Sequence, residues 1–175
     1  MISGKVWMFG DDINTDLMLP TAHMYSPKEI QAQHVFEANR PGWVKLVGKG
    51  DFVFGGKNFG TGSSRPAPLA MTTLGIGCVV AETFNPLFFR NCVSFGLQAL
   101  ECPGVTAAFQ EGDIAEISLA EAKVRNTRTG QTLPGVAIPE ALLSLMAGGG
   151  IFPLLESEGL IGPAPAEAAG AAQGG

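Results

Sequence analysis

Hydrophobic residues in this chain fall in short runs that are separated by glycine, proline and polar turns. Several runs are about five residues long and are followed at once by glycine or an acidic residue, as is typical of buried strands. A later stretch alternates between polar and apolar side chains and precedes two segments that flank a short polar turn. We therefore expect strands over 5–9, 51–55, 77–81 and 113–119, a hairpin over 122–126 and 131–136, and weaker strands at 96–100 and 105–108.

Other segments carry the signals of helix ends. Ser26, Pro27 and Glu29 match an N-cap, a first-turn proline and the glutamate of a capping box. Pro66 and Pro68 suit the first turn of another helix, where a missing N–H costs little. Helices are expected over 27–37, 66–74, 85–95 and 139–146, with a last helical turn or two over 151–158. Because helices and strands interleave and a β-rich stretch follows, the pattern predicts an α/β or mixed β/β/α domain.

Composition narrows the class of protein. Of 175 residues, 46% are hydrophobic and 15% are charged, so residues 1–161 should fold as one domain, whereas the Ala-, Gly- and Pro-rich segment 162–175 is expected to be disordered. The net charge is −5 and no basic patch stands out, which argues against a nucleic-acid partner. No apolar run is long enough to span a membrane, and the first residues lack the apolar core of a signal peptide. A cytoplasmic location is the expectation.

The possible metal ligands are few and widely spaced. Cys78, Cys92 and Cys102 include no C-x-x-C pair, so neither a disulfide framework nor an iron–sulfur cluster held by this chain alone is expected. His23 and His34 lie 11 residues apart, with no further ligand at a spacing typical of zinc sites. The sequence therefore predicts no metal bound by this chain.

The strongest local signal is the glycine-rich segment 55–65. Its glycines allow sharp turns and close approach to a ligand, and Ser63 and Ser64 should fall at the N-terminus of the next helix, which suits an anion. Arg65 adds a planar fork for a carboxylate. This is neither a Walker P-loop nor a nucleophile elbow. A plain glycine-rich turn with a surface arginine is the alternative.

A second signal is an acidic run between two apolar segments. Asp11, Asp12 and Asp16 fall within six residues, without the spacing of a calcium-binding loop. Asx turns and solvated charges explain such a run as well as a binding site does.

Four stretches together resemble the small subunits of 3-isopropylmalate dehydratases, which share the swivel domain of aconitase. The resemblance covers roughly residues 1–160, and the N-F-G and G-S-S-R motifs are its most specific part. The matching stretches are 12–16 with Pro20, 58–65, 84–92 with Gly96 and Leu97, and 149–151.

The resemblance implies a swivelling β/β/α fold and a hydro-lyase that dehydrates and rehydrates a hydroxy acid. It implies that Ser63 is the base, that Ser64 and Arg65 bind a substrate carboxylate, and that Thr15 and Asp16 face a large partner subunit. That partner would carry a [4Fe–4S] cluster and a histidine that pairs with Asp16. This chain would bind no cofactor of its own, would be inactive alone, and could self-associate through the exposed partner face.

Departures from the family pattern bear on the substrate. The usual Glu–His or Glu–Gln after the arginine is replaced by 66–68, Pro–Ala–Pro. The segment 21–25 lacks the arginine with which aconitase reads a further carboxylate, so Met24 and Tyr25 are expected to line a pocket for an apolar group, with His23 as a hydrogen-bonding partner there. The favoured substrate is 2-isopropylmalate. A paralogue for dimethylmalate, methylcitrate or homoaconitate, and a non-catalytic anion-binding module, are the alternatives; a serine hydrolase lacks a convincing triad.

Overall fold

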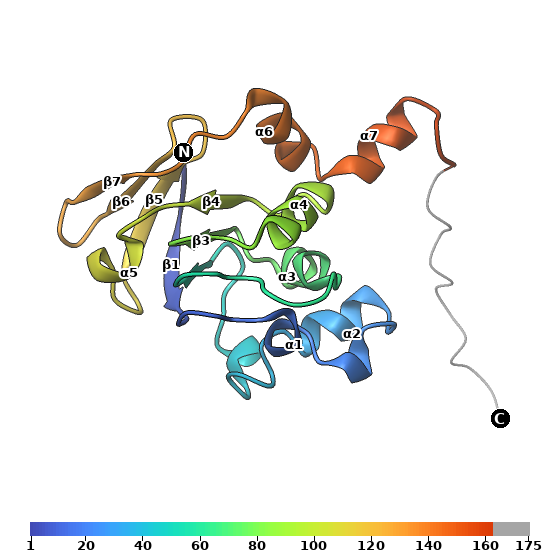
Figure 1. The fold of residues 1–175 in the computed structure, drawn as a ribbon, viewed down its shortest axis with the longest axis horizontal. Coiled ribbons are helices and arrows are strands. Elements are labelled where there is room, and N and C mark those ends of the chain that lie inside the picture. The colour runs from blue at the N-terminus through green and yellow to red at the C-terminus, as the bar shows by residue number, and fades with distance from the viewer. Residues whose placement is uncertain (163–175) are drawn as a thin grey trace.

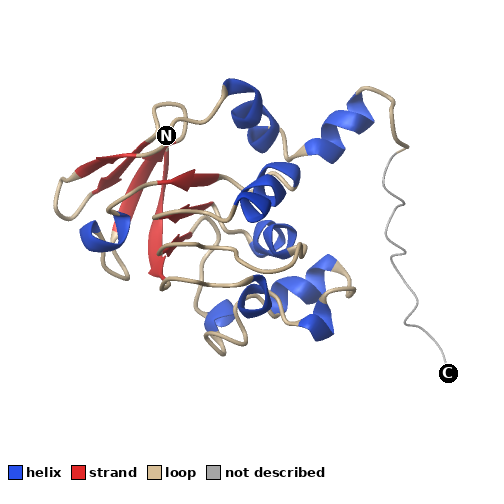
Figure 2. Ribbon diagram, in the orientation of Figure 1, coloured by secondary structure: helices blue, strands red, loops and turns tan. Residues whose placement is uncertain are grey.

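The computed structural model describes residues 1–162, in which the strands form one seven-stranded mixed sheet and most of the helices lie to the right of it in the view of Figures 1 and 2. The strand order is β4-β3-β2-β1-β5-β6-β7. The strands are β1 (Ile2–Met8), β2 (Phe52–Gly55), β3 (Cys78–Ala81), β4 (Ala99–Glu101), β5 (Ile114–Ser118), β6 (Lys123–Asn126) and β7 (Thr132–Pro134).

Strand β1 joins two halves of different character. Its second half pairs in parallel with β2, where Val6 lies beside Phe52, and β3 and β4 extend this parallel half. Its first half pairs antiparallel with β5, where Ile2 lies beside Ile117, and β6 and β7 complete a meander. The predicted mixed sheet is therefore confirmed.

Seven α-helices accompany the sheet within residues 1–162. They are α1 (Thr15–Met18), α2 (Lys28–Gln33), α3 (Ala67–Leu74), α4 (Pro86–Ser94), α5 (Val105–Ala108), α6 (Glu140–Ala147) and α7 (Ile151–Ser157). Short 3-10 turns cover Thr21–His23 and Trp43–Lys45. No helix in this part of the chain has the length and apolar character needed to cross a membrane.

Both faces of the parallel strands are buried, which explains why these strands are continuous apolar runs. Val53 points into a core that contains residues of α1, α3 and α4, together with Trp43. Its neighbours Phe52 and Phe54 point into the opposite core, which contains residues of α5, β5 and β6. Helices α1, α3 and α4 therefore pack on one face, and α5 with the antiparallel strands closes the other.

Two sequence expectations were wrong in detail. Residues 105–108 form the helical turn α5 instead of a strand, because the Glu82 carboxylate accepts hydrogen bonds from the backbone N–H groups of Gly104 (2.6 Å) and Thr106 (2.9 Å). Helix α2 ends at Gln33 instead of residue 37, and its N-cap is Pro27, with no side-chain cap from Ser26. The expected tail lies, except for Gly162, outside the described residues.

A buried carboxylate holds the antiparallel half together. Asp113 is 7% exposed and accepts hydrogen bonds from Arg128 Nε (2.6 Å), Asn126 Nδ2 (2.8 Å) and the Gln110 amide (2.9 Å). The hydrogen bond from Arg128 is the main reason that the pKa of Asp113 lies well below its usual range. The carboxylate thereby ties the start of β5 to the turn between β6 and β7.

We expect Asp113→Asn to lower the free energy of unfolding by about 2 kcal/mol, because charged hydrogen bonds to a buried group are lost. The folded-state pKa is depressed, so this stabilisation is complete above the unfolded pKa of about 3.9 and is lost as pH falls through the folded value. Urea unfolding at pH 7 and at pH 3 measures both effects. Glu116→Gln, which removes the more exposed ion pair with Arg125, serves as the control and should change stability by about 0.5 kcal/mol or less. Equal losses in the two variants would contradict the assignment.

Candidate functional site

The site is built from the two loops that follow the parallel strands β1 and β2. Beyond the strands, these loops continue to pair through backbone hydrogen bonds. The donors and acceptors are Gly56 N to Gly10 O (3.0 Å), Asp12 N to Lys57 O (2.9 Å), Gly60 N to Ile13 O (2.8 Å) and Thr15 N to Thr61 O (2.8 Å). Carboxyl ends of adjacent parallel strands are the usual place for a ligand in an open α/β sheet.

Two glycines make this pairing possible. Gly60 has a φ of +86°, and a Cβ there would lie 2.2 Å from Cγ of Phe88. Gly62 has a φ of +98°, and its Cβ would lie 3.0 Å from Oγ1 of Thr15. The left-handed backbone and the lack of space both require glycine. The glycines thus allow close packing against side chains of α4 and α1, a role that the sequence motif alone does not reveal.

Helix α1, which was not predicted, positions the first pair of candidate residues. Asn14 caps it by accepting a hydrogen bond from the Leu17 amide (2.9 Å). Thr15 is buried and donates from Oγ1 to the carbonyl oxygen of Ser63 (2.9 Å), which links the two loops. The side chain of Asp16 is 64% exposed on the outer side of the helix.

Arg65 lies at the centre of the site and is buried, contrary to the surface arginine of the simpler alternative. It is 8% exposed as a residue. Its Nε donates to Oγ of Ser63 (3.3 Å), and Nη1 donates to the Leu19 carbonyl oxygen and to Oγ1 of Thr21 (both 3.1 Å). Its Nη2 forms an ion pair with the Asp16 carboxylate. The guanidinium therefore connects both loops and α1.

Ser63 and Ser64 are exposed, but they do not lie at a helix N-terminus, so this expectation was wrong. Helix α3 begins at Ala67, with Pro66 as its N-cap. A proline disfavours helical conformation in the residue before it, so Arg65 cannot extend the helix backwards. Pro66 and Pro68 also lack N–H groups, which reduces the donors available to an anion. Instead, Oγ of Ser64 accepts a hydrogen bond from Asn91 Nδ2 of α4 (3.0 Å).

The structure brings Thr15, Asp16, Ser63 and Arg65 together, and it places the other candidates differently. The ring of His23 stacks on that of His34, with ring centroids 3.5 Å apart. The carbonyl oxygen of Met24 accepts a hydrogen bond from Gln31 Nε2 (2.9 Å). Tyr25 is 91% exposed.

Thr21, on the other hand, contacts Arg65 and was not singled out in the sequence. Thr21 belongs to no recognisable sequence motif, and its contact with Arg65 arises only in the folded turn.

The three cysteines are free and buried. Burial raises the pKa of the Cys78 and Cys92 thiols far above their usual range and that of Cys102 to about 11. These groups remain protonated near neutral pH. Buried, protonated thiols do not fit the thiolate ligands that an iron–sulfur cluster needs.

Comparison with known proteins gives one consistent family. Residues 27–104 match the model of the aconitase C-terminal domain. A protein of Methanocaldococcus jannaschii named isopropylmalate/citramalate isomerase small subunit is 40% identical over 160 residues, covering 90% of this chain and 95% of that protein. The 3-isopropylmalate dehydratase small subunit 1 of Methanopyrus kandleri is 41% identical over 162 residues, covering 91% and 95%. A crystal structure of 3-isopropylmalate dehydratase from Methanocaldococcus jannaschii superposes with a TM-score of 0.84 and 30% identity, covering 91% of this chain and 95% of that chain.

We expect Thr15→Val to loosen the two loops without filling or emptying space. The variant loses the hydrogen bond to the Ser63 carbonyl, which costs about 1 kcal/mol of unfolding free energy. Amide hydrogen exchange should accelerate in 60–65 and remain unchanged in β2 and β3.

Thr73→Val is the matched control for this prediction. Thr73 also donates to a carbonyl oxygen, that of Leu69 (2.8 Å), but on the exposed side of α3. It should change stability by about 0.5 kcal/mol or less. Unchanged exchange of 60–65 in Thr15→Val would show that the hydroxyl does not hold the loops.

Proposed function

The chain belongs to the family of 3-isopropylmalate dehydratase small subunits, and on this premise we propose that it supplies the proton-transfer side of a hydro-lyase site that a large subunit completes. The proposed reaction removes water from 2-isopropylmalate and adds it back to give 3-isopropylmalate, a step of leucine biosynthesis in the cytoplasm. The reaction class in this proposal is taken from the names of the relatives, an isomerase and a dehydratase small subunit. The observation that carries the assignment of residues is the contact between Ser63 Oγ and the buried guanidinium of Arg65.

Ser63 serves as the base in this proposal. A serine oxygen takes a proton from carbon only if its alkoxide is stabilised, because the neutral hydroxyl is a weak base. Arg65 Nε lies 3.3 Å from Oγ, and the positive charge of the guanidinium is buried. Since α3 starts at Ala67 and two prolines lack N–H groups, Arg65 supplies more of this stabilisation than the helix amides do. The proton lost from the carbon next to the carboxylate passes to Oγ as the hydroxyl group departs.

Arg65 also offers a binding position for a carboxylate, and Asp16 occupies that position in the isolated chain. The Asp16 carboxylate pairs with Nη2. Because its side chain is 64% exposed, Asp16 can turn to solvent, and the buried guanidinium that it leaves then requires another carboxylate. We infer that Asp16 turns to a histidine of the large subunit on assembly, so that a substrate carboxylate takes its place. Ser64 directly precedes Arg65 in the chain and is held by Asn91, and in this proposal it contributes a hydroxyl group to the same carboxylate.

A large subunit is required for two physical reasons. Ser63, Ser64 and Asp16 are exposed, so this chain alone excludes little water from the reacting atoms. The [4Fe–4S] cluster that activates the leaving hydroxyl in this chemistry has no fitting thiolates among residues 1–162 and belongs to the partner in the proposal.

The segment 21–25 bears on which group the substrate carries beside its carboxylates. No arginine occurs in 21–25, which favours an apolar substituent over a third carboxylate. Met24 is half-buried there and suits such a group, whereas Tyr25 is 91% exposed and the ring of His23 stacks on that of His34. Citramalate, with a methyl group in place of isopropyl, is a second candidate because the relative from Methanocaldococcus jannaschii carries both substrates in its name.

The first test is a hydratase assay that follows the absorbance of the unsaturated acid. The chain is measured alone and after anaerobic mixing with a cluster-bearing large subunit, with isopropylmalate, citramalate, dimethylmalate and citrate in parallel. Turnover is expected only in the mixture, with kcat/KM for isopropylmalate at least about tenfold above that for citrate, since a pocket without a second cation leaves a third carboxylate unpaired. A formed complex with an intact cluster and no turnover of any acid would favour the anion-binding module.

Ser63→Ala should lower kcat about 1,000-fold or more in the assembled enzyme, because the positioned base is lost. Subunit affinity should stay within about twofold of wild type, as the change removes only an exposed hydroxyl. Ser144→Ala, at an exposed position of α6, is the control and should retain full activity. A Ser63→Ala enzyme that keeps normal kcat and complex formation would remove Ser63 from the reaction.

A further inference from the structure

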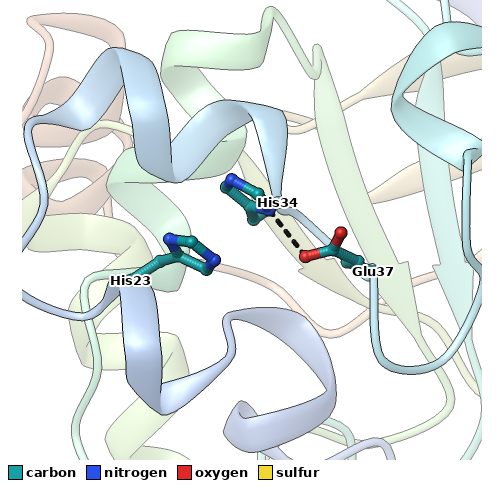
Figure 3. Close-up of side chains that lie close together, drawn as sticks. All are labelled: His23, His34 and Glu37. Carbon is teal, nitrogen blue, oxygen red and sulfur yellow. Dashed lines mark hydrogen bonds and ion pairs between the residues drawn. The ribbon is translucent and has the colours of Figure 1, made fainter.

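Two imidazoles and a carboxylate gather beside the site, where the turn at 21–25 meets the end of α2 (Figure 3). The rings of His23 and His34 are stacked, with centroids 3.5 Å apart and an interplanar angle of 6°. Nδ1 of His34 lies 2.6 Å from Oε2 of Glu37. One ligand atom from each of the three residues falls within 4.8 Å of the other two. The three side chains point into a common space that solvent can reach, since Glu37 is 49% exposed.

Backbone contacts hold the segments that carry these side chains. Phe36 lies between His34 and Glu37 in the sequence, and its ring is fully buried. Its amide donates a hydrogen bond to the Met18 carbonyl oxygen (2.9 Å). Gln31 of α2 donates to the Met24 carbonyl oxygen (2.9 Å) and so joins the helix to the turn that carries His23. The positions of the three Cα atoms are therefore set by the fold, and the side chains are left to adjust.

We propose that His23, His34 and Glu37 bind one divalent transition-metal ion of the zinc class. Imidazole nitrogens suit zinc, cobalt and nickel, whereas magnesium and calcium prefer an all-oxygen set. Two histidines and one carboxylate provide three protein ligands, and a water molecule completes a tetrahedron. No spacing rule predicts this set from the sequence, because folding brings His23 to a residue 11 positions later.

Binding requires a small rearrangement of side chains. In a tetrahedral zinc site with bonds of about 2.0–2.1 Å, the ligand atoms lie about 3.4 Å apart, so no separation among the three ligand atoms has to close by more than about 1.4 Å. The lone pair of an imidazole nitrogen lies in the plane of its ring, so parallel rings must also tilt to share an ion. The side chain of His34 is 26% exposed and that of Glu37 is 49% exposed, which leaves both room to turn.

The ion would join the turn at 21–25 to α2. That turn also contains Thr21, whose Oγ1 accepts a hydrogen bond from Arg65 (3.1 Å). A metal bound to His23 thus fixes the backbone two residues from this contact and steadies the edge of the proposed substrate site. The metal site stands on its own geometry and does not depend on the hydro-lyase assignment.

The test uses the full chain after removal of metals by a chelator. Titration with Co²⁺ followed by visible absorption, and with Zn²⁺ by calorimetry, should give one ion per chain and intense ligand-field bands of a tetrahedral site. A zinc concentration about 100-fold above Kd should raise Tm by about 5–10 °C. The imidazole proton resonances of both histidines should shift with zinc, and the amides of 20–26 should exchange more slowly.

Variants distinguish this site from adventitious binding. His23→Ala and His34→Ala should each weaken zinc binding by more than about 100-fold, since loss of an outer partner alone costs about 10–100-fold. Glu37→Gln should also weaken it, and Glu121→Gln, an exposed carboxylate of the distant hairpin, should have no effect. Circular dichroism confirms that each variant is folded. A wild-type chain without saturable one-to-one binding, or His23→Ala with unchanged affinity, would overturn the proposal.

Discussion

The buried guanidinium of Arg65 is the interaction on which the rest of the site depends. A cation in a protein interior costs several kcal/mol unless its donors are paired, and here the partners come from Leu19, Thr21, Ser63 and Asp16. These residues belong to two loops that lie far apart in the sequence. Satisfying one charge therefore forces the loops together, and Ser63 is positioned by the same contact.

The loops can meet only because their backbones follow the sheet beyond its strands. Parallel pairing of β1 with β2 places the carboxyl ends of the two strands side by side, and backbone hydrogen bonds from Gly60 and Thr15 continue the pairing into the loops. Gly60 and Gly62 keep this approach free of steric conflict with Phe88 and Thr15. The sequence of this glycine-rich segment suggests a loop that binds a ligand. At these two positions, however, glycine is needed because protein segments pack closely against the backbone.

Features that depend on residues close together in the sequence were predictable, whereas features that depend on distant residues were not. The buried strands and the 123–134 hairpin follow from local patterns of apolar residues and turns. Residues 105–108 form a short apolar run that fits either a helix or a strand, and a distant carboxylate, Glu82, decided between them. Ser63, Arg65 and Asp16 were identified by resemblance to a family, but the burial of Arg65 and the contact of Thr21 arise only from tertiary structure.

The difference in exposure between the two members of the central ion pair indicates how the site can change state. Arg65 is buried and bonded to Leu19 and Thr21, so moving it would break contacts that hold the loops. Asp16 is exposed and can turn to solvent, but the buried guanidinium that it leaves needs another anion as its partner. Exchange of Asp16 for another carboxylate therefore costs little, whereas the cation that receives it stays in place. A site with a fixed cation and a replaceable anion is suited to a substrate that carries the same charged group as the residue it displaces.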